Sequence, residues 1–231
     1  MTTVMADQIA SQTEARARRS QGTSETAIYE MVAEALQERA KAGGRFGVLV
    51  DVGCGSGQLW SVVRNKFAHY IGVDAVRYQD FPEAAEFCLA DLDAGKTSLP
   101  DECADVVASV ETIEHLENPR AFMRELVRLT KPGGSVVVTT PNQLSLLSLL
   151  TLVIKKRFSA FQDVHYPAHL TALLEVDLKR IAAEGGLIDA HIRYSLQGRL
   201  ILTPWHYPRF LTRIFPSVLS DNLMLIGTKP S

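Results

Sequence analysis

The feature that most constrains the fold is the segment VLVDVGCGSGQL, which runs from Val48 to Leu59. A hydrophobic run closes on Asp51, and glycine then occupies every second position from Gly53 to Gly57. The hydrophobic run predicts a buried strand, and glycine lets the backbone after it turn sharply. A strand, a glycine-rich turn and a helix in this order begin a β-α-β unit, so the segment predicts a parallel sheet.

Hydrophobic and amphipathic segments alternate in the same way along the rest of the chain. Predicted strands cover residues 48–52, 70–73, 86–90, 104–110, 135–140, 188–194 and 223–228, and predicted helices cover residues 24–42, 58–67, 119–130 and 176–184. Asn118 and Pro119 mark one helix start, and Gly43 and Gly44 mark one helix end. This alternation predicts an α/β fold with a doubly wound parallel sheet, whose ligands lie at the carboxyl ends of the strands.

The composition is that of one globular domain. With 231 residues, 46% hydrophobic and 22% charged, the chain is long enough for one large α/β domain and too short for two. Residues 1–21 are polar and are predicted to form a mobile arm. Residues 22–231 then form a single domain, with an apolar and basic lid or substrate insertion at about residues 142–170.

Charge and cysteine content exclude several classes of function. The formal net charge of −2 excludes a generally basic nucleic-acid binder. From Asn142 onward ten Lys and Arg stand against six Asp and Glu, an excess for which solvated surface charge is the simplest interpretation. Cys54, Cys88 and Cys103 fit neither a disulfide framework nor a metal spacing. Together with a polar N-terminus that lacks a secretory signal, they predict a cytoplasmic protein.

The spacing of the glycines narrows the ligand of the turn, which could be a dinucleotide, a nucleoside triphosphate or S-adenosylmethionine. A dinucleotide-binding turn has the pattern G-x-G-x-x-G, but Gln58 takes the position of its third glycine. A Walker A loop requires a lysine directly after its glycines, and none is present. Spacing therefore excludes the first two ligands.

The pattern D-x-G-x-G-x-G after a hydrophobic strand resembles motif I of the class I S-adenosylmethionine-dependent methyltransferases. The resemblance implies that the turn receives the methionyl end of the cofactor, that Asp74 accepts the ribose hydroxyls, and that Asp91 and Leu92 contact the adenine. The cofactor-binding residues that it implies are Asp51, Gly53, Cys54, Gly55, Gly57, Asp74, Asp91, Leu92 and Val110. It spans about residues 47–142 and implies a Rossmann-like, seven-stranded, mostly parallel sheet with an antiparallel last strand.

Candidate catalytic groups follow the fourth predicted strand, where VETIEHLENP contains Glu111, Glu114 and His115. Methyl transfer to a hydroxyl requires the loss of its proton, and His115, oriented by a carboxylate, could take that proton as a general base. An equally good interpretation is that the glutamate–histidine pair caps the helix entry. An acceptor that ionises readily needs no base.

The insertion adds two histidines, His165 and His169, in QDVHYPAHLTA. Pro167 between them favours a loop that covers the cofactor over one helix that carries both, and a packing role explains them as well as a catalytic one. The catalytic candidates as a set are Glu111, His115, His165 and His169.

Glu111, Glu114, His115 and one loop histidine are also ligand types of a Mg²⁺ or Mn²⁺ site. Similar E-x-x-E-H strings occur in RNA 2′-O-methyltransferases that act on the 3′ ends of small RNAs, and also in metal-free ubiquinone-pathway O-methyltransferases. The chain lacks the Asp-His-Arg and Phe-Glu-Trp residues of the RNA enzymes and is slightly acidic. We therefore expect neither a metal nor a nucleic-acid partner; the alternatives are a metal-dependent RNA methyltransferase and a non-catalytic cofactor-binding regulator.

The insertion also bears on the methyl acceptor. In residues 144–157, LSLLSLLTLVIKKR, apolar positions follow helical spacing and end in three cations. The simplest interpretation is a helix packed into the core; the alternatives are a wall of the substrate pocket and a peripheral membrane contact. The apolar run is about half the ~20 residues that span a bilayer. The loose similarity to ubiquinone-pathway and surface-glycan methyltransferases implies O-methylation of a small-molecule or glycan-type acceptor. Neither the acceptor's identity nor the oligomeric state is encoded in a pattern that we recognise.

Overall fold

The computed structural model describes residues 14, 17–18, 22–40, 46–201 and 203–231. Its strands are β1 (Phe46–Val52), β2 (Phe67–Asp74), β3 (Glu86–Leu89), β4 (Ala104–Ser109), β5 (Thr130–Pro141), β6 (Ile188–Tyr194) and β7 (Asn222–Thr228). Its helices are α2 (Thr26–Ala40), α3 (Gln58–Val63), α4 (Pro119–Leu129), α5 (Leu146–Lys155), α6 (Glu175–Glu184), α7 (Arg209–Ile214) and α8 (Pro216–Leu219). Short 3-10 helices are η1 (Arg64–Lys66), η2 (Ile113–His115) and η3 (Asp163–His165). Most of the predicted arm, and the two glycines predicted to end the first helix, lie outside the described residues.

All seven of these strands join one sheet, in the order β3-β2-β1-β4-β5-β7-β6. Strands β1 to β5 pair in parallel, and β7 is antiparallel to both β5 and β6. The strand order reverses between β1 and β4, which places the ligand crevice beyond the carboxyl ends of these two strands. The predicted α/β fold, a mostly parallel seven-stranded sheet with an antiparallel last strand, is confirmed.

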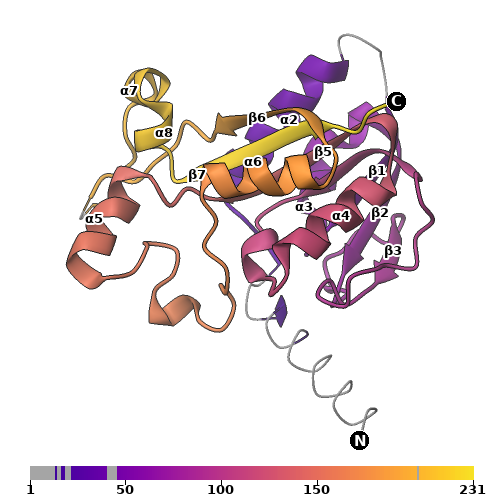
Figure 1. The fold of residues 1–231 in the computed structure, drawn as a ribbon, viewed down its shortest axis with the longest axis horizontal. Helices are drawn as coiled ribbons and strands as arrows, with labels where there is room; N and C mark the ends of the chain where they lie inside the picture. The colour runs from indigo at the N-terminus through magenta and orange to yellow at the C-terminus, as the bar shows by residue number, and fades with distance from the viewer. Residues whose placement is uncertain (1–13, 15–16, 19–21, 41–45, 202) are drawn as a thin grey trace, which may run out of the picture.

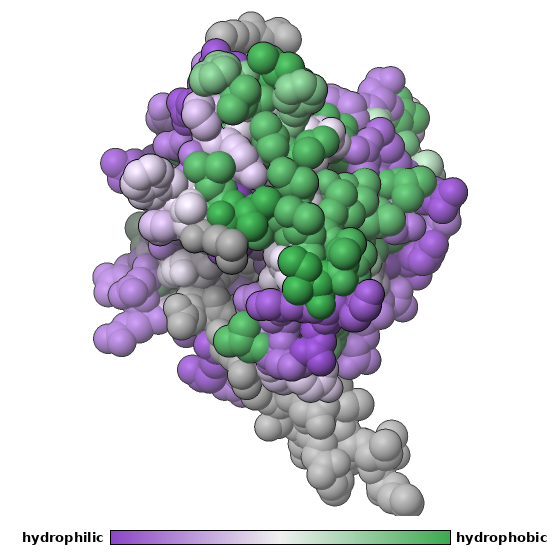
Figure 2. All heavy atoms as spheres, turned by 90° about the vertical axis from the view of Figure 1, so that its left-hand side faces the viewer, coloured by the Kyte–Doolittle hydropathy of each residue, from purple (hydrophilic) through white to green (hydrophobic). Residues whose placement is uncertain are grey.

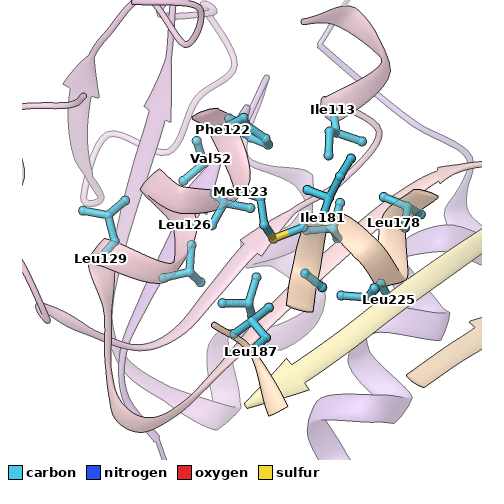
Figure 3. Packing of buried hydrophobic residues seen from close by; sticks show 14 of the residues in the cluster. Val52, Ile113, Phe122, Met123, Leu126, Leu129, Leu178, Ile181, Leu187 and Leu225 are labelled. Atoms are coloured by element: carbon cyan, nitrogen blue, oxygen red, sulfur yellow. The ribbon is translucent and has the colours of Figure 1, made fainter. Parts of the chain in front are cut away.

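Helices cover both faces of the sheet, because neighbouring residues of a strand point to opposite faces. Val50 and Val52 of β1 pack with α4 and α6, whereas Leu49 packs with α2 and α3. Figure 1 shows α4 and α6 in front of the strands and α2 behind them. Figure 3 shows Phe122 of α4 and Ile181 of α6 converging on the sheet. Burial of each such side chain contributes about 1.5–3 kcal/mol, so these layers hold the strand ends in place.

Element boundaries differ from prediction where ring packing lengthens a strand. β1 begins at Phe46 and β2 at Phe67, both earlier than predicted, since these two residues are paired across the strands and their rings stack at 5.0 Å. The helix predicted over residues 58–67 therefore ends at Val63 and continues as η1. β5 is also longer than predicted and begins directly after α4.

The prediction that residues 144–157 pack into the core is wrong. A helix does form there, capped by the Ser145 side chain, but Ser148 is the only buried residue of α5. Its last turn is open to solvent, with Val153 67% and Ile154 76% exposed. Figure 1 shows that α5 extends away from the end of the sheet, so its apolar residues have no layer to pack against. None of the helices in the described residues is long and apolar enough to cross a membrane.

Candidate functional site

A cavity of about 590 Å³ lies at the carboxyl ends of β1, β2 and β4. This is where the reversal of strand order predicts a ligand, and the volume lies in the range of about 300–1,000 Å³ that small-molecule sites occupy. Four parts of the chain far apart in the sequence line it: the segment before α2 with the start of that helix, the strand ends with their turns, the insertion, and residues 199 and 221–222. The predicted site residues that line it are Gly53, Cys54, Gly55, Asp74, Leu92, Val110, Glu111, His115, His165 and His169.

The glycine turn approaches its neighbours too closely for any side chain. The amides of Gly53 and Cys54 donate to the Val73 carbonyl at 2.7 and 3.1 Å. Gly53 has φ +79°, and a Cβ atom there would lie 2.1 Å from Thr112 Oγ1. A Cβ atom on Gly55, at φ +51°, would lie 2.1 Å from the Gly22 carbonyl oxygen. The alternate glycines are therefore a steric requirement of this turn.

The segment before α2 closes one side of the cavity. The Ser56 amide donates to the Gly22 carbonyl at 3.0 Å, which places residues 22–24 against the glycine turn. The Tyr29 hydroxyl accepts from the Ser24 amide at 3.1 Å. Tyr29 is buried, and both residues line the cavity. Sequence reasoning missed these residues, because only a helix start marks them in the sequence.

Two residues of the predicted cofactor set support the turn from behind and do not line the cavity. Asp51 is buried; its Oδ2 accepts from the Tyr70 hydroxyl at 2.9 Å, and its Oδ1 has no partner among the described residues. Burial raises the pKa of Asp51 to about 7. Gly57 caps α3 in a left-handed conformation. The predicted contact between Asp51 and the cofactor stays a prediction.

Asp74 faces the cavity from the end of β2. Its Oδ2 accepts from the Gly55 amide at 2.8 Å and its Oδ1 from the Val76 amide at 3.3 Å. Burial raises its pKa, and the backbone amides oppose that shift. These bonds orient the carboxylate beside the glycine turn, and its predicted contact with the ribose hydroxyls stays a prediction.

The acidic residue that lines the cavity beyond β3 is Asp93, not the predicted Asp91. Asp91 Oδ1 accepts from the Asp93 amide at 3.0 Å, so this carboxylate shapes the turn. Asp93 in turn accepts from the Glu117 amide at 2.8 Å. Leu92 lies between the two and lines the cavity, and any role of Asp91 toward adenine stays a prediction.

Glu111 lies directly after β4 with strained backbone. Its φ is +48°, in the left-handed region that costs a residue with a side chain about 1–3 kcal/mol. Its amide donates to Thr139 Oγ1 at 2.9 Å, and the same hydroxyl donates to Glu111 Oε1 at 3.0 Å. Asn222 of β7 donates to Oε2 at 2.9 Å. Burial, and next Glu114, raise the pKa of Glu111 well above its ordinary value.

Three histidines gather in another part of the cavity lining, here called the histidine wall. The ring centroids of His115 and His169 are 4.7 Å apart, and those of His165 and His169 are 5.4 Å apart. His115 Nδ1 lies 2.8 Å from the Ala168 carbonyl, and His169 Nδ1 lies 2.7 Å from the Ala160 carbonyl. A carbonyl oxygen can only accept, so both Nδ1 atoms carry hydrogen and both Nε2 atoms present a lone pair when the rings are neutral.

The electrostatics of this wall keep His169 neutral. Burial, followed by the nearby His115, lowers the pKa of His169 to about 4. His165 differs from the other two, because its Nδ1 accepts from the Gln162 amide at 3.2 Å. Its own Nε2 therefore carries the hydrogen in the neutral ring. His115 can accept a proton through Nε2, both His115 and His169 can bind a cation through Nε2, and His165 can donate a hydrogen bond.

Glu114 joins the insertion to η2. Its carbonyl accepts from the Leu170 and Thr171 amides at 2.9 and 3.0 Å, and its Oε2 accepts from Thr140 Oγ1 at 3.2 Å. Burial raises the pKa of this carboxyl, and His115 opposes the shift. Oε1 is buried and has no partner among the described residues.

One ligand atom each from Glu114, His115 and His169 lies within 4.8 Å of the others. The orphaned Glu114 oxygen and the carbonyl-oriented imidazoles fit a divalent cation, since metal-binding histidines usually donate their other N–H in this way. Glu111, which the sequence also suggested as a ligand, is instead held by Thr139 and Asn222. The arrangement therefore suits either a proton acceptor or a cation.

Comparisons with known proteins identify the family of the chain. A family model described as "Methyltransferase domain" matches residues 24–192. The ubiquinone biosynthesis O-methyltransferase of Rhodopseudomonas palustris (strain BisB18) is 34% identical over 108 residues, which are 41% of this chain and 40% of that protein. The 2-methyl-6-phytyl-1,4-hydroquinone methyltransferase of Synechocystis sp. is 33% identical over 102 residues, 41% of this chain and 32% of that protein.

The fold also matches solved structures. A "SAM dependent methyltransferase" from Archaeoglobus fulgidus superposes with a TM-score of 0.60 at 22% identity, over 87% of this chain and 94% of that one. The match to the curated relatives is partial, since each alignment covers under half of the relative's length. The family model covers most of the chain, and it is this match that decides the family. The chain belongs to the class I S-adenosylmethionine-dependent methyltransferases.

Proposed function

We propose that this protein transfers the methyl group of S-adenosylmethionine to an oxygen atom of a small-molecule or glycan-type acceptor. The observation that carries the proposal is the shared cavity. The glycine turn and Asp74, here called the cofactor wall, line the same cavity as His115 of the histidine wall, which presents an Nε2 lone pair. Cofactor and acceptor groups can therefore meet in one space of about 590 Å³.

The residues on the cofactor wall have complementary roles in this proposal. The turn at Gly53 and Gly55 admits the methionyl end, since no side chain fits there. Asp74 accepts the ribose hydroxyls, held by its bonds to the Gly55 and Val76 amides. Leu92 and Val110 offer apolar contact to the adenine.

His115 takes the acceptor's proton in this proposal. The cofactor supplies an electrophilic methyl group: the acceptor oxygen forms a bond to the methyl carbon while the carbon–sulfur bond breaks and its electron pair stays on sulfur. His115 Nε2 receives the hydroxyl proton, and the Ala168 carbonyl fixes the ring through Nδ1. Glu114 stabilises the imidazolium that results, since the two groups attract each other. Alignment of the two substrates is the larger contribution, because the donor is already reactive.

Oxygen as the accepting atom is supported by the relatives. Two of them are named for ubiquinone biosynthesis O-methylation and for methylation of a phytyl hydroquinone. The first name specifies transfer to oxygen. The half-buried histidine wall supports the same choice, because a hydroxyl benefits from a base more than a thiolate or an amine does.

A second candidate function is favoured by Glu114, His115 and His169. In that case the enzyme is cation-dependent, as in the RNA-modifying alternative. A bound divalent cation would lower the pKa of the acceptor hydroxyl, and His115 would then be a ligand rather than a base.

Label transfer from radioactive S-adenosylmethionine tests both candidates. The purified protein is incubated with the labelled donor and a cell extract fractionated into small molecules, glycans, lipids and RNA. We expect label in a small-molecule, glycan or lipid fraction, and transfer that survives a chelator. Label in RNA that is lost with chelator and restored by Mn²⁺ would establish the second candidate, and no label in any fraction would contradict both.

A further inference from the structure

Apolar side chains gather on the end of the molecule that carries α5, α7 and α8. Eleven of the fifteen large hydrophobic residues that are exposed among the described ones fall in two stretches, 144–166 and 205–218. They are Leu144, Leu149, Val153, Ile154, Val164, Tyr166, Trp205, Phe210, Ile214, Phe215 and Val218, here called the apolar face. Figure 2 shows a broad hydrophobic patch on this side of the molecule.

The two stretches form one surface. Asn142, just before α5, donates through Nδ2 to the carbonyls of Ser217 and Ser220 at 2.8 Å each, which ties α5 to α8. Figure 1 shows the three helices at the same end of the sheet. A patch of this extent is unusual on a protein surface that has no partner, so it indicates a surface that is covered in use.

The charges around the apolar face are almost all positive. The first stretch, 144–166, contains Lys155, Lys156, Arg157 and one acid, and the second stretch, 205–218, contains Arg209 and Arg213 and no acid. Asp163 is the nearby acid of the insertion, and it pairs with Arg157. The exposed cations Lys155, Lys156, Arg209 and Arg213 have no acidic partner among the residues that the structure describes.

This combination identifies what covers the face. A second copy of the chain would place these cations against the same cations, with no unpaired acid to offset them. A bilayer interface with anionic lipids meets both features, because aromatic and aliphatic side chains enter the headgroup boundary while Lys and Arg contact phosphate. Trp205, which is 72% exposed, has the amphipathic ring that such boundaries favour.

The apolar face also adjoins the cavity. Val164 is 71% exposed and lines the cavity as well, next to His165. Arg199 lines it too, and this residue is paired with His206 of the second stretch. The mouth of the cavity therefore opens beside the surface that would meet the lipid.

We propose that the apolar face docks onto an anionic lipid bilayer and presents the mouth of the cavity to it. The docking deepens the proposed function, since it places the enzyme where membrane-resident acceptors lie. It rests on the proposed function only for that consequence, because lipid binding needs neither donor nor turnover.

Vesicle flotation tests the docking. We expect the full chain to float with vesicles in which a quarter of the lipid is phosphatidylglycerol, and at least tenfold less with pure phosphatidylcholine. Ile154→Glu/Phe210→Glu and Lys155→Glu/Lys156→Glu should each lower flotation at least tenfold. Leu89→Glu, at a residue 69% exposed on β3 at the opposite end, and Arg64→Glu on η1 are the matched controls and should float like the parent.

Fluorescence locates the contact. The chain has two tryptophans, and Trp60 stacks on Tyr70 at 4.9 Å, away from the apolar face. Brominated phosphatidylcholine in the anionic vesicles should quench the parent and leave Trp205→Phe unquenched. Calorimetry with S-adenosylmethionine on each variant shows whether the cofactor site is intact, so a failure of docking is distinguished from a failure of methyl-donor binding. The absence of flotation, equal flotation of the patch and control variants, quenching that persists in Trp205→Phe, or a dimer that buries the face in sedimentation would each overturn the proposal.

Discussion

The cofactor wall and the histidine wall of the cavity are built in opposite ways. On the cofactor wall a key contact joins residues that are close in sequence: the Gly55 amide donates to Asp74, nineteen residues away. On the histidine wall His115 bonds to Ala168 fifty-three residues away, and Glu111 bonds to Asn222 at a separation of 111. One wall is a local motif, and the other exists only after the whole sheet and its insertion are assembled.

Because of this difference, we expect substitutions on the two walls to affect donor binding and turnover separately. A change on the cofactor wall should weaken binding of the methyl donor, because the glycine turn and Asp74 are the groups proposed to hold it. A change on the histidine wall should spare donor binding and remove turnover. The variants below test that separation.

The largest effect is expected for His115→Ala. Loss of the base should lower turnover by about 100- to 10,000-fold, because general bases contribute in this range. The affinity for S-adenosylmethionine should stay within about threefold, as the contacts of the cofactor wall are untouched. Turnover is measured as label transfer into the fraction that accepts it, and affinity by calorimetry.

The control for this variant is His191→Ala, since His191 is an exposed histidine on β6. Its turnover should equal that of the parent. If His115→Ala keeps full turnover, the base is elsewhere or none is needed. If it loses donor affinity instead, the two walls are not separable.

The next effect is expected for Gly53→Ala. The new Cβ would meet Thr112 Oγ1 at 2.1 Å, so donor affinity should fall at least about 100-fold. Gly95→Ala is the matched control, since Gly95 also has positive φ, +95°, but a Cβ there meets no atom within 4 Å. Calorimetry measures the affinity, and circular dichroism melting shows whether the fold is retained. Equal losses in both variants would mean that backbone strain, not the close approach, explains the effect.

A smaller effect is expected on the pH dependence of the free energy of unfolding, measured without S-adenosylmethionine. The pKa of Asp51 is about 7 in the folded chain and about 3.9 when unfolded. Its contribution to stability is fully present below about pH 4 and is lost as pH rises to about 7, because the unfolded chain ionises first. Asp51→Asn removes this titration.

From pH 5 to pH 8 the parent should therefore lose roughly 3 kcal/mol more stability than Asp51→Asn. Urea unfolding at the two pH values measures the difference. Asp80→Asn, at an exposed aspartate, is the control and should follow the parent. If the parent and Asp51→Asn lose the same stability between pH 5 and pH 8, the titration of Asp51 does not cause the loss.

The same contrast explains which features of the fold and of the site can be predicted from the sequence. The strand order and the glycine turn could be predicted, because hydrophobic runs and alternate glycines are local patterns with direct physical meaning. Even there, Asp91 illustrates a limit, since the next acid along the chain, Asp93, is the one that lines the cavity. A single turn can reverse which of two neighbouring carboxylates faces a ligand.

The histidine wall was predicted only as a set of candidates. Residue type singled out His115, His165 and His169. The tautomers of His115 and His169, however, depend on the carbonyls of Ala168 and Ala160, which no side-chain pattern encodes. Asn222 gave no signal at all, because an asparagine at a strand start is ordinary. Residues 144–157 were correctly predicted to form a helix, but the prediction that this helix packs into the core was wrong. Apolar spacing indicates that a helix has an apolar side, but not which surface that side contacts.

Titration of S-adenosylmethionine into the parent and into Asp74→Ala is the most direct test that the cofactor wall binds the methyl donor. The Asp74 carboxylate lines the cavity and is fixed by the Gly55 and Val76 amides. Hydrogen bonds to a charged group contribute about 1.5–3 kcal/mol, so the parent should bind and Asp74→Ala should bind about 10- to 100-fold more weakly. Equal affinity in the two proteins, or no binding by the parent, would contradict the account.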